Sequence, residues 1–265
     1  MTRQAPAWSR LALIAMWTLA LLPPLAVALY AFSTRWDRSL LPEGASLRWL
    51  VETLRSARVR DAVAETAMLS LASALLTLVV GGSASVFARL AAPRLAVLLD
   101  AMALLPYAIP PVVIAIGALE LFVGRLGAWL DLRLVYVVVV TPLLFPLLHK
   151  TLGAAMTQLD APQLLEAGRT LGASDAVTLR RVLLPLLAPA LTAGLLLCWV
   201  TAAMEFAIAN LLLGGSIEML QPLINGMRGV NGHVSAALIV LSFAVVAAMG
   251  WMVEGLTAWN ARRNS

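Results

Sequence analysis

The amino-acid sequence predicts an all-α, polytopic membrane protein with six transmembrane helices. Of its 265 residues, 61% are hydrophobic and only 12% are charged, and the mean hydropathy is +0.90. This composition lies far from that of a soluble domain. Uncharged runs long enough to cross a bilayer recur along the chain, and each is expected to be a helix because unpaired backbone amides are not tolerated in hydrocarbon. The predicted spans are Leu11–Thr34, Thr66–Ala88, Ala101–Leu119, Leu134–His149, Val182–Met204 and Val234–Val253.

These spans leave little chain for a separate soluble domain, so residues 1–265 are expected to form a single transmembrane domain. The first apolar run follows basic residues, as the core of a signal peptide does. It is longer than the about 7–15 residues typical of such a core, and more spans follow it. We therefore expect a retained first helix, kinked near Pro23 and Pro24.

The basic residues weakly favour an orientation with both termini in the cytoplasm. In this orientation the short inner segments carry Arg89, Arg94 and Lys150, among others, whereas the short outer loops carry few basic residues. The net charge of +5 comes from residues scattered at the membrane boundaries. Without a clustered basic helix, this charge does not indicate nucleic-acid binding.

The sequence lacks the motifs of an ATPase, a common hydrolase or a metal site. Lys150-Thr151 is the only pair that could end a Walker A loop, and Leu144 and His149 stand where its glycines would have to be. Cys198 lies inside an apolar run and is expected to serve packing. His149 and His233 are predicted on opposite sides of the membrane, which argues against a shared metal site. We therefore expect no catalytic residue, no metal and no cofactor bound by this chain.

A polar segment, Asp160–Pro189, separates the fourth and fifth apolar runs. Within it, Glu166-Ala167-Gly168 is followed after three residues by Gly172, and after nine more by Val182-Leu183-Leu184-Pro185. This spacing resembles the EAA loop of the permease subunits of type I ATP-binding-cassette importers, whose pattern is EAA-x3-G-x9-I-x-L-P. Two positions depart from the pattern: Gly168 replaces the second alanine and Val182 replaces isoleucine. The segment can form two short helices around a turn at Gly172.

The resemblance implies a function for this segment. In the family, the cytoplasmic coupling loop, here about residues 151–185, docks on a separate ATPase and transmits its motion to the transmembrane helices. The chain would form half of the translocation path for a small solute, in the style of the polyamine, phosphonate, ferric-iron, thiamine and sulfate permeases. Carried over by position, the ATPase-coupling residues are Glu166, Ala167, Gly168, Gly172, Arg180, Arg181, Leu184 and Pro185.

The resemblance also implies partners and a location. The partners would be two ATPase subunits, which use ATP and Mg, a second permease subunit that is paralogous or identical, an extracytoplasmic substrate-binding protein and the lipid bilayer. The location would be the bacterial inner (plasma) membrane, with the chain crossing it several times.

Two polar residues near the end of the fifth span are candidates for the translocation path. A carboxylate at the bilayer centre costs about 2.5–3.5 kcal/mol, so Glu205 is expected to face protein or water. Asn210 follows closely, and the later spans line the path in this family. An interhelical hydrogen bond or a position near the outer interface would also explain Glu205. Pro106, Pro110 and Pro111 suggest that the third helix is kinked or broken.

Two other functional classes stay open on the sequence alone. A secondary active transporter driven by an ion gradient would carry ion-site acids within broken helices and often internal repeats, for which Glu205 is thin support. A membrane-embedded enzyme has little room because nucleophile and metal motifs are missing. The sequence does not identify the substrate, the partner proteins or whether the two permease subunits are alike.

Overall fold

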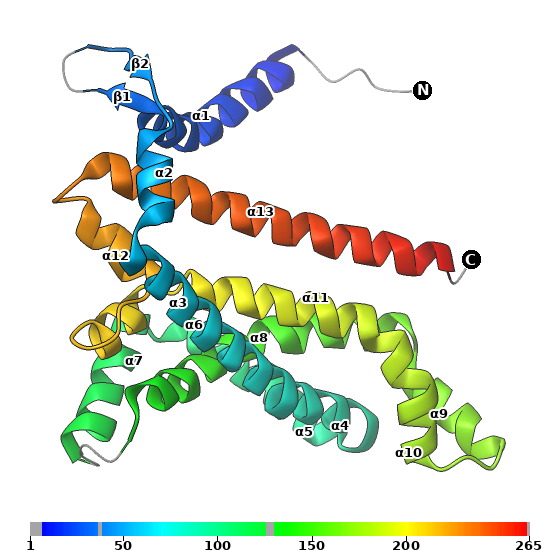
Figure 1. The fold of residues 1–265 in the computed structure, drawn as a ribbon. Coiled ribbons are helices and arrows are strands. Elements are labelled where there is room, and N and C mark those ends of the chain that lie inside the picture. The colour runs from blue at the N-terminus through cyan, green and yellow to red at the C-terminus, as the bar shows by residue number, and fades with distance from the viewer. Residues whose placement is uncertain (1–6, 37–38, 126–129, 264–265) are drawn as a thin grey trace. The chain divides into compact units, whose positions relative to one another are not determined.

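The computed structural model describes residues 7–36, 39–125 and 130–263, and the contacts within it divide the chain into two units. Unit 1 comprises Met1–Arg60 and Leu223–Val245, and unit 2 comprises Asp61–Pro222 and Val246–Ser265. Figure 1 shows the ribbon with its elements labelled.

Unit 1 combines helices with a short hairpin. Strand β1 pairs antiparallel with β2, with Ser33 opposite Ala45. The first helix therefore ends at Ala31, before the predicted Thr34, because the next residues pair as a strand. The elements that lie in unit 1, wholly or in part, are α1 (Ala7–Ala31), β1 (Ser33–Arg35), β2 (Glu43–Ala45), α2 (Arg48–Arg55), the start of α3 (Ala57–Leu76), α12 (Leu220–Met227) and α13 (Gly232–Arg263).

Stacked rings tie the start of α13 to the end of α1 within unit 1. The imidazole of His233 stacks on Tyr30 and on Trp49, with ring centroids 4.0 and 5.0 Å apart. Its Nδ1 lies 3.0 Å from the Tyr30 carbonyl oxygen, to which it donates. The Trp49 indole donates to the carbonyl of Ser33 at 3.1 Å. Ring stacking and these hydrogen bonds fix the hairpin against both helices.

Unit 2 contains most of the helices. Several of its helices run on through single turns of π-helix, a form often found at functional sites. The π-helical segments among the described residues are Thr77–Gly82, Leu119–Arg125, Leu179–Leu183 and Ala209–Leu213. The α-helices that lie in unit 2, wholly or in part, are α3 (Ala57–Leu76), α4 (Ser83–Ala91), α5 (Pro93–Met102), α6 (Leu105–Ala108), α7 (Pro111–Ala118), α8 (Leu132–Gln158), α9 (Ala161–Thr170), α10 (Asp175–Thr178), α11 (Leu184–Ala203), α12 and α13.

The prediction of an all-α polytopic membrane protein is confirmed. In the described part of the chain, five helices are long and apolar enough to cross a membrane. A sixth span results if the helix pair Pro93–Ala108 and Pro111–Phe122 crosses as one, with a bend of 92° between its parts. The break falls at Ile109 and Pro110, just before α7 begins at Pro111, because proline lacks the amide that would continue the helix and restricts the residue before it.

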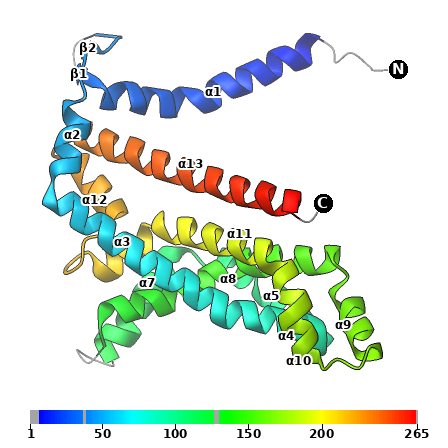
Figure 2. The same cartoon turned by 45° about the vertical axis from the view of Figure 1, so that its right-hand side comes forward.

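The core of unit 2 lies along α8, which packs against α11 over most of its length (Figures 1 and 2). Tyr136, Leu144, Leu148 and Leu152 of α8 are fully buried, as is Cys198 of α11. A methyl group at Gly194 would come within 2.6 Å of the Leu148 side chain, so this glycine permits the close approach. Helix α8 is therefore the central element on which the other helices of unit 2 pack.

Candidate functional site

The polar segment between α8 and α11 folds as two short helices around a glycine turn. Helix α9 ends in a left-handed residue, Gly172, with φ of +82°. The amide of Gly172 donates to the Arg169 carbonyl at 3.0 Å, and the amide of Ala173 donates to the Gly168 carbonyl at 2.9 Å. Together these bonds form a Schellman motif, which ends a helix and reverses the chain. The predicted turn at Gly172 is therefore present, with the backbone conformation that favours glycine.

Two contacts hold α9 and α10 together across this turn. The Arg169 guanidinium donates two hydrogen bonds to the Asp175 carboxylate, each 2.7 Å long. Donation of these hydrogen bonds to Asp175 raises the pKa of Arg169 above its usual range. Nearby, a Cβ atom at Gly168 would collide with the Thr178 side chain, which is buried. The glycine that departs from the family pattern thus lets the two helices approach closely.

The inner face of the segment packs on the helical bundle. Leu165 and Ala161 of α9 are buried in a cluster with Val86 of α4 and Met156 of α8. Leu183 and Leu187 belong to the same cluster. Helix α9 therefore contacts both α4 and α8 (Figure 2).

The outer face carries an unusual combination of side chains. Leu171, at the apex of the turn, is 87% exposed although it is a large apolar residue. Glu166 of α9 is exposed, and so are Arg180 and Arg181. A hollow of about 460 Å³ lies beside Val177 and the two arginines. An apolar apex with charged flanks is suited to bind a protein surface.

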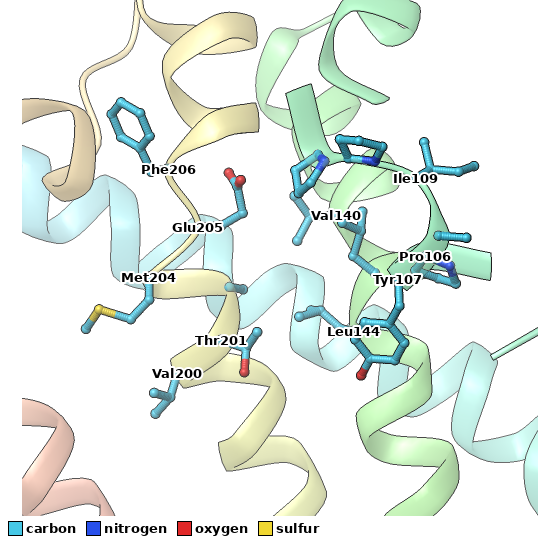
Figure 3. A pocket seen from close by; sticks show the side chains of 15 residues that line it. Pro106, Tyr107, Ile109, Val140, Leu144, Val200, Thr201, Met204, Glu205 and Phe206 are labelled. Carbon is cyan, nitrogen blue, oxygen red and sulfur yellow. The ribbon is translucent and has the colours of Figure 1, made fainter. Parts of the chain in front are cut away.

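A second candidate site is a cavity of about 710 Å³ in unit 2. Figure 3 shows Pro106, Tyr107 and Ile109 on one wall and Thr201, Met204 and Glu205 on the other. The helix break of the third span therefore contributes one complete wall. Further lining residues come from α8 and include Val140, Leu143 and Leu144.

Glu205 lies beyond the end of α11, and not within the fifth span as the sequence suggested. Its carboxylate accepts hydrogen bonds from the amides of Ile208, at 2.9 and 3.0 Å, and of Ala209, at 2.9 Å. It thereby caps the helical turn that follows, which satisfies amides that have no partner within the helix. Among the described residues that line the cavity, Glu205 is the one with a charged side chain.

A family model covers most of the chain. Residues 81–263 match the model of the binding-protein-dependent transport system inner membrane component. The chain belongs to this family. It is the inner-membrane permease subunit of a type I ATP-binding-cassette importer, and it crosses the membrane several times. The matched region contains α4 to α11, and with them the Asp160–Pro189 segment (the predicted coupling segment) and the cavity.

Curated relatives of the permease transport small solutes. It is 28% identical to the spermidine/putrescine transport system permease protein PotC of Haemophilus influenzae, over 77% of this chain and 80% of the relative. It is 31% identical to PotC of Escherichia coli K12, over 57% of this chain and 58% of that one. The sulfate transport system permease protein CysT of Salmonella typhimurium is 32% identical over 45% of this chain and 46% of the relative.

Solved structures share the fold of the permease. A bacterial ABC transporter involved in the import of the acidic polysaccharide alginate matches with a TM-score of 0.64, at 16% identity, over 94% of this chain and 95% of that one. The MetNI methionine ABC transporter, in an inward-facing conformation, matches with a TM-score of 0.59, at 18% identity, over 75% of this chain and 93% of that one.

The structure brings most of the sequence-predicted coupling residues of the permease onto one segment. Leu184 and Pro185 begin α11, where the segment joins the membrane helix, and both are exposed. Asn210, in contrast, is exposed and is not among the residues that line the cavity next to Glu205. The remaining predicted coupling residues lie on α9, its turn and the π-helical segment before α11: Glu166, Ala167, Gly168, Gly172, Arg180 and Arg181.

Sequence reasoning missed a polar network at the end of α4. Asp100 of α5 lies 3.2 Å from Arg89 and 2.8 Å from His149 of α8, and His149 reaches Ser85 at 2.7 Å. One available signal was the i,i+4 spacing of Ser85 and Arg89, which places both on one face of a helix. A second signal was the position of the four residues: the second, third and fourth predicted spans all place them near the same side of the membrane.

Proposed function

We propose that this permease subunit binds a separate ATPase through the Asp160–Pro189 segment and forms half of the path by which a small solute is imported. The observation that supports the proposal best is the two-faced structure of the segment. Leu165 anchors its inner face in the bundle, whereas Leu171 and the flanking charges are exposed on its outer face. In this arrangement the segment faces the cytoplasm, so both termini are cytoplasmic as well.

The proposed mechanism is alternating access driven by the partner. ATP and Mg are used by two ATPase subunits, whose closure pushes the Glu166–Pro185 segment. The Arg169–Asp175 pair and the close packing at Gly168 make this segment stiff, so its displacement is passed on to α4, α8 and α11. A second permease, identical or paralogous, completes the path, and an extracytoplasmic binding protein delivers the solute.

The relatives suggest the first solutes to test. Spermidine and putrescine are named for the PotC permeases, and sulfate is named for CysT. Glu205, the charged side chain among the described residues that line the cavity, is largely engaged in capping, so it does not by itself select between a cation and an anion.

The experiment compares two loop variants of the permease co-expressed with its ATPase and second permease. Glu166→Lys reverses a charge on the outer face, and Gly172→Pro cannot adopt the positive φ of the turn because proline fixes φ near −65°. We expect both variants to insert into the membrane but to lose most of the co-purified ATPase and of the uptake of radiolabelled spermidine, putrescine or sulfate.

Matched controls lie in unit 1. Glu43→Lys reverses a charge on the exposed β2 strand, and Gly229→Pro replaces an exposed glycine whose φ is not positive. Both should retain the ATPase and the uptake. Normal ATPase binding and undiminished uptake by the two loop variants would refute the coupling assignment. Uptake that survives depletion of ATP would instead favour an ion-driven secondary transporter.

A further inference from the structure

The network around Asp100 joins three helices through one carboxylate. Asp100 Oδ1 accepts from the Arg89 guanidinium at 3.2 Å and from His149 Nε2 at 2.8 Å. His149 is fully buried, and its Nδ1 lies 2.7 Å from Ser85 Oγ. The Ser85 hydroxyl also lies 2.7 Å from the Gly81 carbonyl. Arg89 and Ser85 belong to α4, Asp100 to α5 and His149 to α8.

The order Ser85–His149–Asp100 has the connectivity of a hydrolase triad, but its surroundings exclude that role. A nucleophilic hydroxyl must reach a substrate carbonyl beside an oxyanion hole. Ser85 Oγ is fully buried within a helix and has the Gly81 carbonyl as a hydrogen-bond acceptor. The network therefore holds helices in place.

Asp100 provides the hydrogen bonds that attach α5 to its neighbours α4 and α8. No residue of α5 is fully buried, and only a few of its apolar side chains, such as Leu95 and Leu99, are half-buried, so apolar packing alone fixes its position weakly. The Asp100 side chain is 55% exposed, and its charge-assisted bonds supply the attachment that burial does not. Gly153 of α8 contributes by its size, because a Cβ atom there would lie 2.5 Å from the Arg89 guanidinium.

Helix α4 connects this attachment to the coupling segment. Ser85 and Arg89 occupy one face of α4 and hold α8 and α5. Val86 and Leu90, each one residue further along, pack in the cluster that contains Leu165 of α9. A displacement of α9 is thus passed through α4 to Arg89 and Asp100.

On its other side, α5 leads into the wall of the cavity. After Met102 the chain continues into α6, where Pro106 and Tyr107 line the cavity, and then bends by 92°. The position of α5 therefore determines the position of Tyr107 in the cavity wall.

We propose that Asp100 is a positioning residue that, through Arg89 and His149, ties the cavity wall at Tyr107 to the motion of the coupling segment. This inference rests on the proposed function of that segment. When the hydrogen bonds of Asp100 are removed, the ATPase can still bind and hydrolyse ATP, but the cavity wall at Tyr107 no longer moves with the coupling segment.

The test uses the assembled transporter in proteoliposomes and needs no knowledge of the solute. Tyr107→Cys serves as a reporter, because Tyr107 is exposed at the cavity and the single native cysteine, Cys198, is buried. A water-soluble maleimide is added with and without ATP plus vanadate, and the labelling rate is measured together with ATP hydrolysis. In the reporter alone, we expect ATP plus vanadate to change the labelling rate about tenfold, a usual size for coupling between sites.

Asp100→Ala in this background should abolish the ATP-dependent change in labelling while ATP hydrolysis persists. Asp100→Asn, which retains an acceptor for His149 but loses the charge beside Arg89, should reduce the change partially. ATP-dependent labelling in Asp100→Ala equal to that in the reporter alone would overturn the proposal. Absence of any ATP-dependent change in the reporter alone would count against both the proposal and the coupling function.

Gly153→Ala provides an independent test that keeps every charged side chain. The added methyl group displaces Arg89 from its site, so the ATP-dependent change in labelling should fall as in Asp100→Asn. Gly117→Ala is the matched control, because a Cβ atom there meets nothing within 4 Å. Unaltered ATP-dependent labelling in Gly153→Ala would contradict the proposal even if Asp100→Ala failed to assemble.

Discussion

The two ends of α8 attach to their neighbours in different ways. Near its start, Arg133 donates to Glu65 of α3 at 2.5 and 3.1 Å. About 24 Å further along, from the rise of 1.5 Å per residue, His149 belongs to the network that holds Arg89 of α4 and Asp100 of α5. The first attachment is one ion pair between two helices, and the second is a network among three.

Burial explains the difference. Helix α3 contributes Leu69 and Ala74 to the same buried core as Tyr136 and Val140 of α8, so it is held by packing whether or not the ion pair forms. Helix α5 has no fully buried residue, so its polar contacts contribute more to its position than those of α3 do. Polar side chains therefore do more positioning at the end of α8 near the coupling segment, where the proposed mechanism requires a helix to move in register with its neighbours.

The largest effect is expected from His149→Ala. This change removes a fully buried ring that stacks on Phe145, and it also removes the bonds to Ser85 and Asp100. Loss of packing and of these hydrogen bonds should lower the free energy of unfolding by about 2–4 kcal/mol. Thermal unfolding of the permease in detergent measures it. If the unfolding temperature of His149→Ala equalled that of the unmodified chain within error, the polar network at this end of α8 would not contribute more to stability than the ion pair at the other end.

Gly153→Ala should have the next largest effect on stability. Its methyl group overlaps the guanidinium end of Arg89, which has to move and give up its bond to Asp100, so the free energy of unfolding should fall by about 1–2 kcal/mol. The cost should largely disappear in the double variant Gly153→Ala/Arg89→Ala, so the two changes are expected to be strongly non-additive. Additive losses in the same unfolding assay would show that Arg89 does not occupy the space at Gly153.

Gly168→Ala extends the comparison to the coupling segment. It introduces the residue of the family pattern, yet a Cβ atom at this position collides with Thr178. We expect the free energy of unfolding to fall by about 1–2 kcal/mol and less ATPase to co-purify, because the added methyl group forces α9 and α10 apart. The double variant Gly168→Ala/Thr178→Ala should recover ATPase binding. If Gly168→Ala alone binds the ATPase normally, the close approach of α9 and α10 is not required for coupling.

Arg133→Gln, at the opposite end of α8, should have the smallest effect. Its ion pair with Glu65 is partly exposed, with 41% and 24% of the two side chains accessible, and ion pairs screened by solvent contribute little to stability. We therefore expect a small change in the unfolding midpoint and unaltered ATP-dependent labelling at position 107. If Arg133→Gln lowered the unfolding midpoint as much as His149→Ala, both ends of α8 would depend equally on polar contacts.

Much of this fold could be predicted from the sequence because the bilayer imposes simple rules. Apolar runs located the spans, and the prolines near residue 110 anticipated the broken third helix. Gly172 was expected to adopt a left-handed conformation, and it does. The coupling roles of Glu166, Arg180 and Arg181 stay a prediction from the family pattern, since exposure alone does not show what they bind.

The remainder depends on contacts between residues far apart in the chain. Asp100 and His149 are 49 residues apart in the sequence, and hydropathy does not show that they meet. Glu205 read as a buried acid in a helix, because the sequence did not show that α11 ends at Ala203 and that this carboxylate caps the next turn. The β1–β2 hairpin was missed because its strands are only three residues long.

Photo-crosslinking at the apex of the coupling segment tests the central claim most directly. A photoreactive amino acid would replace Leu171, which is 87% exposed, and in a control protein it would replace Leu40, which is 97% exposed in unit 1. In cells that express the whole transporter, we predict an adduct with the ATPase from position 171 and none from position 40. An adduct from position 40 but not from 171, or no ATPase adduct from 171, would contradict the assignment of this segment as the site where the permease receives energy.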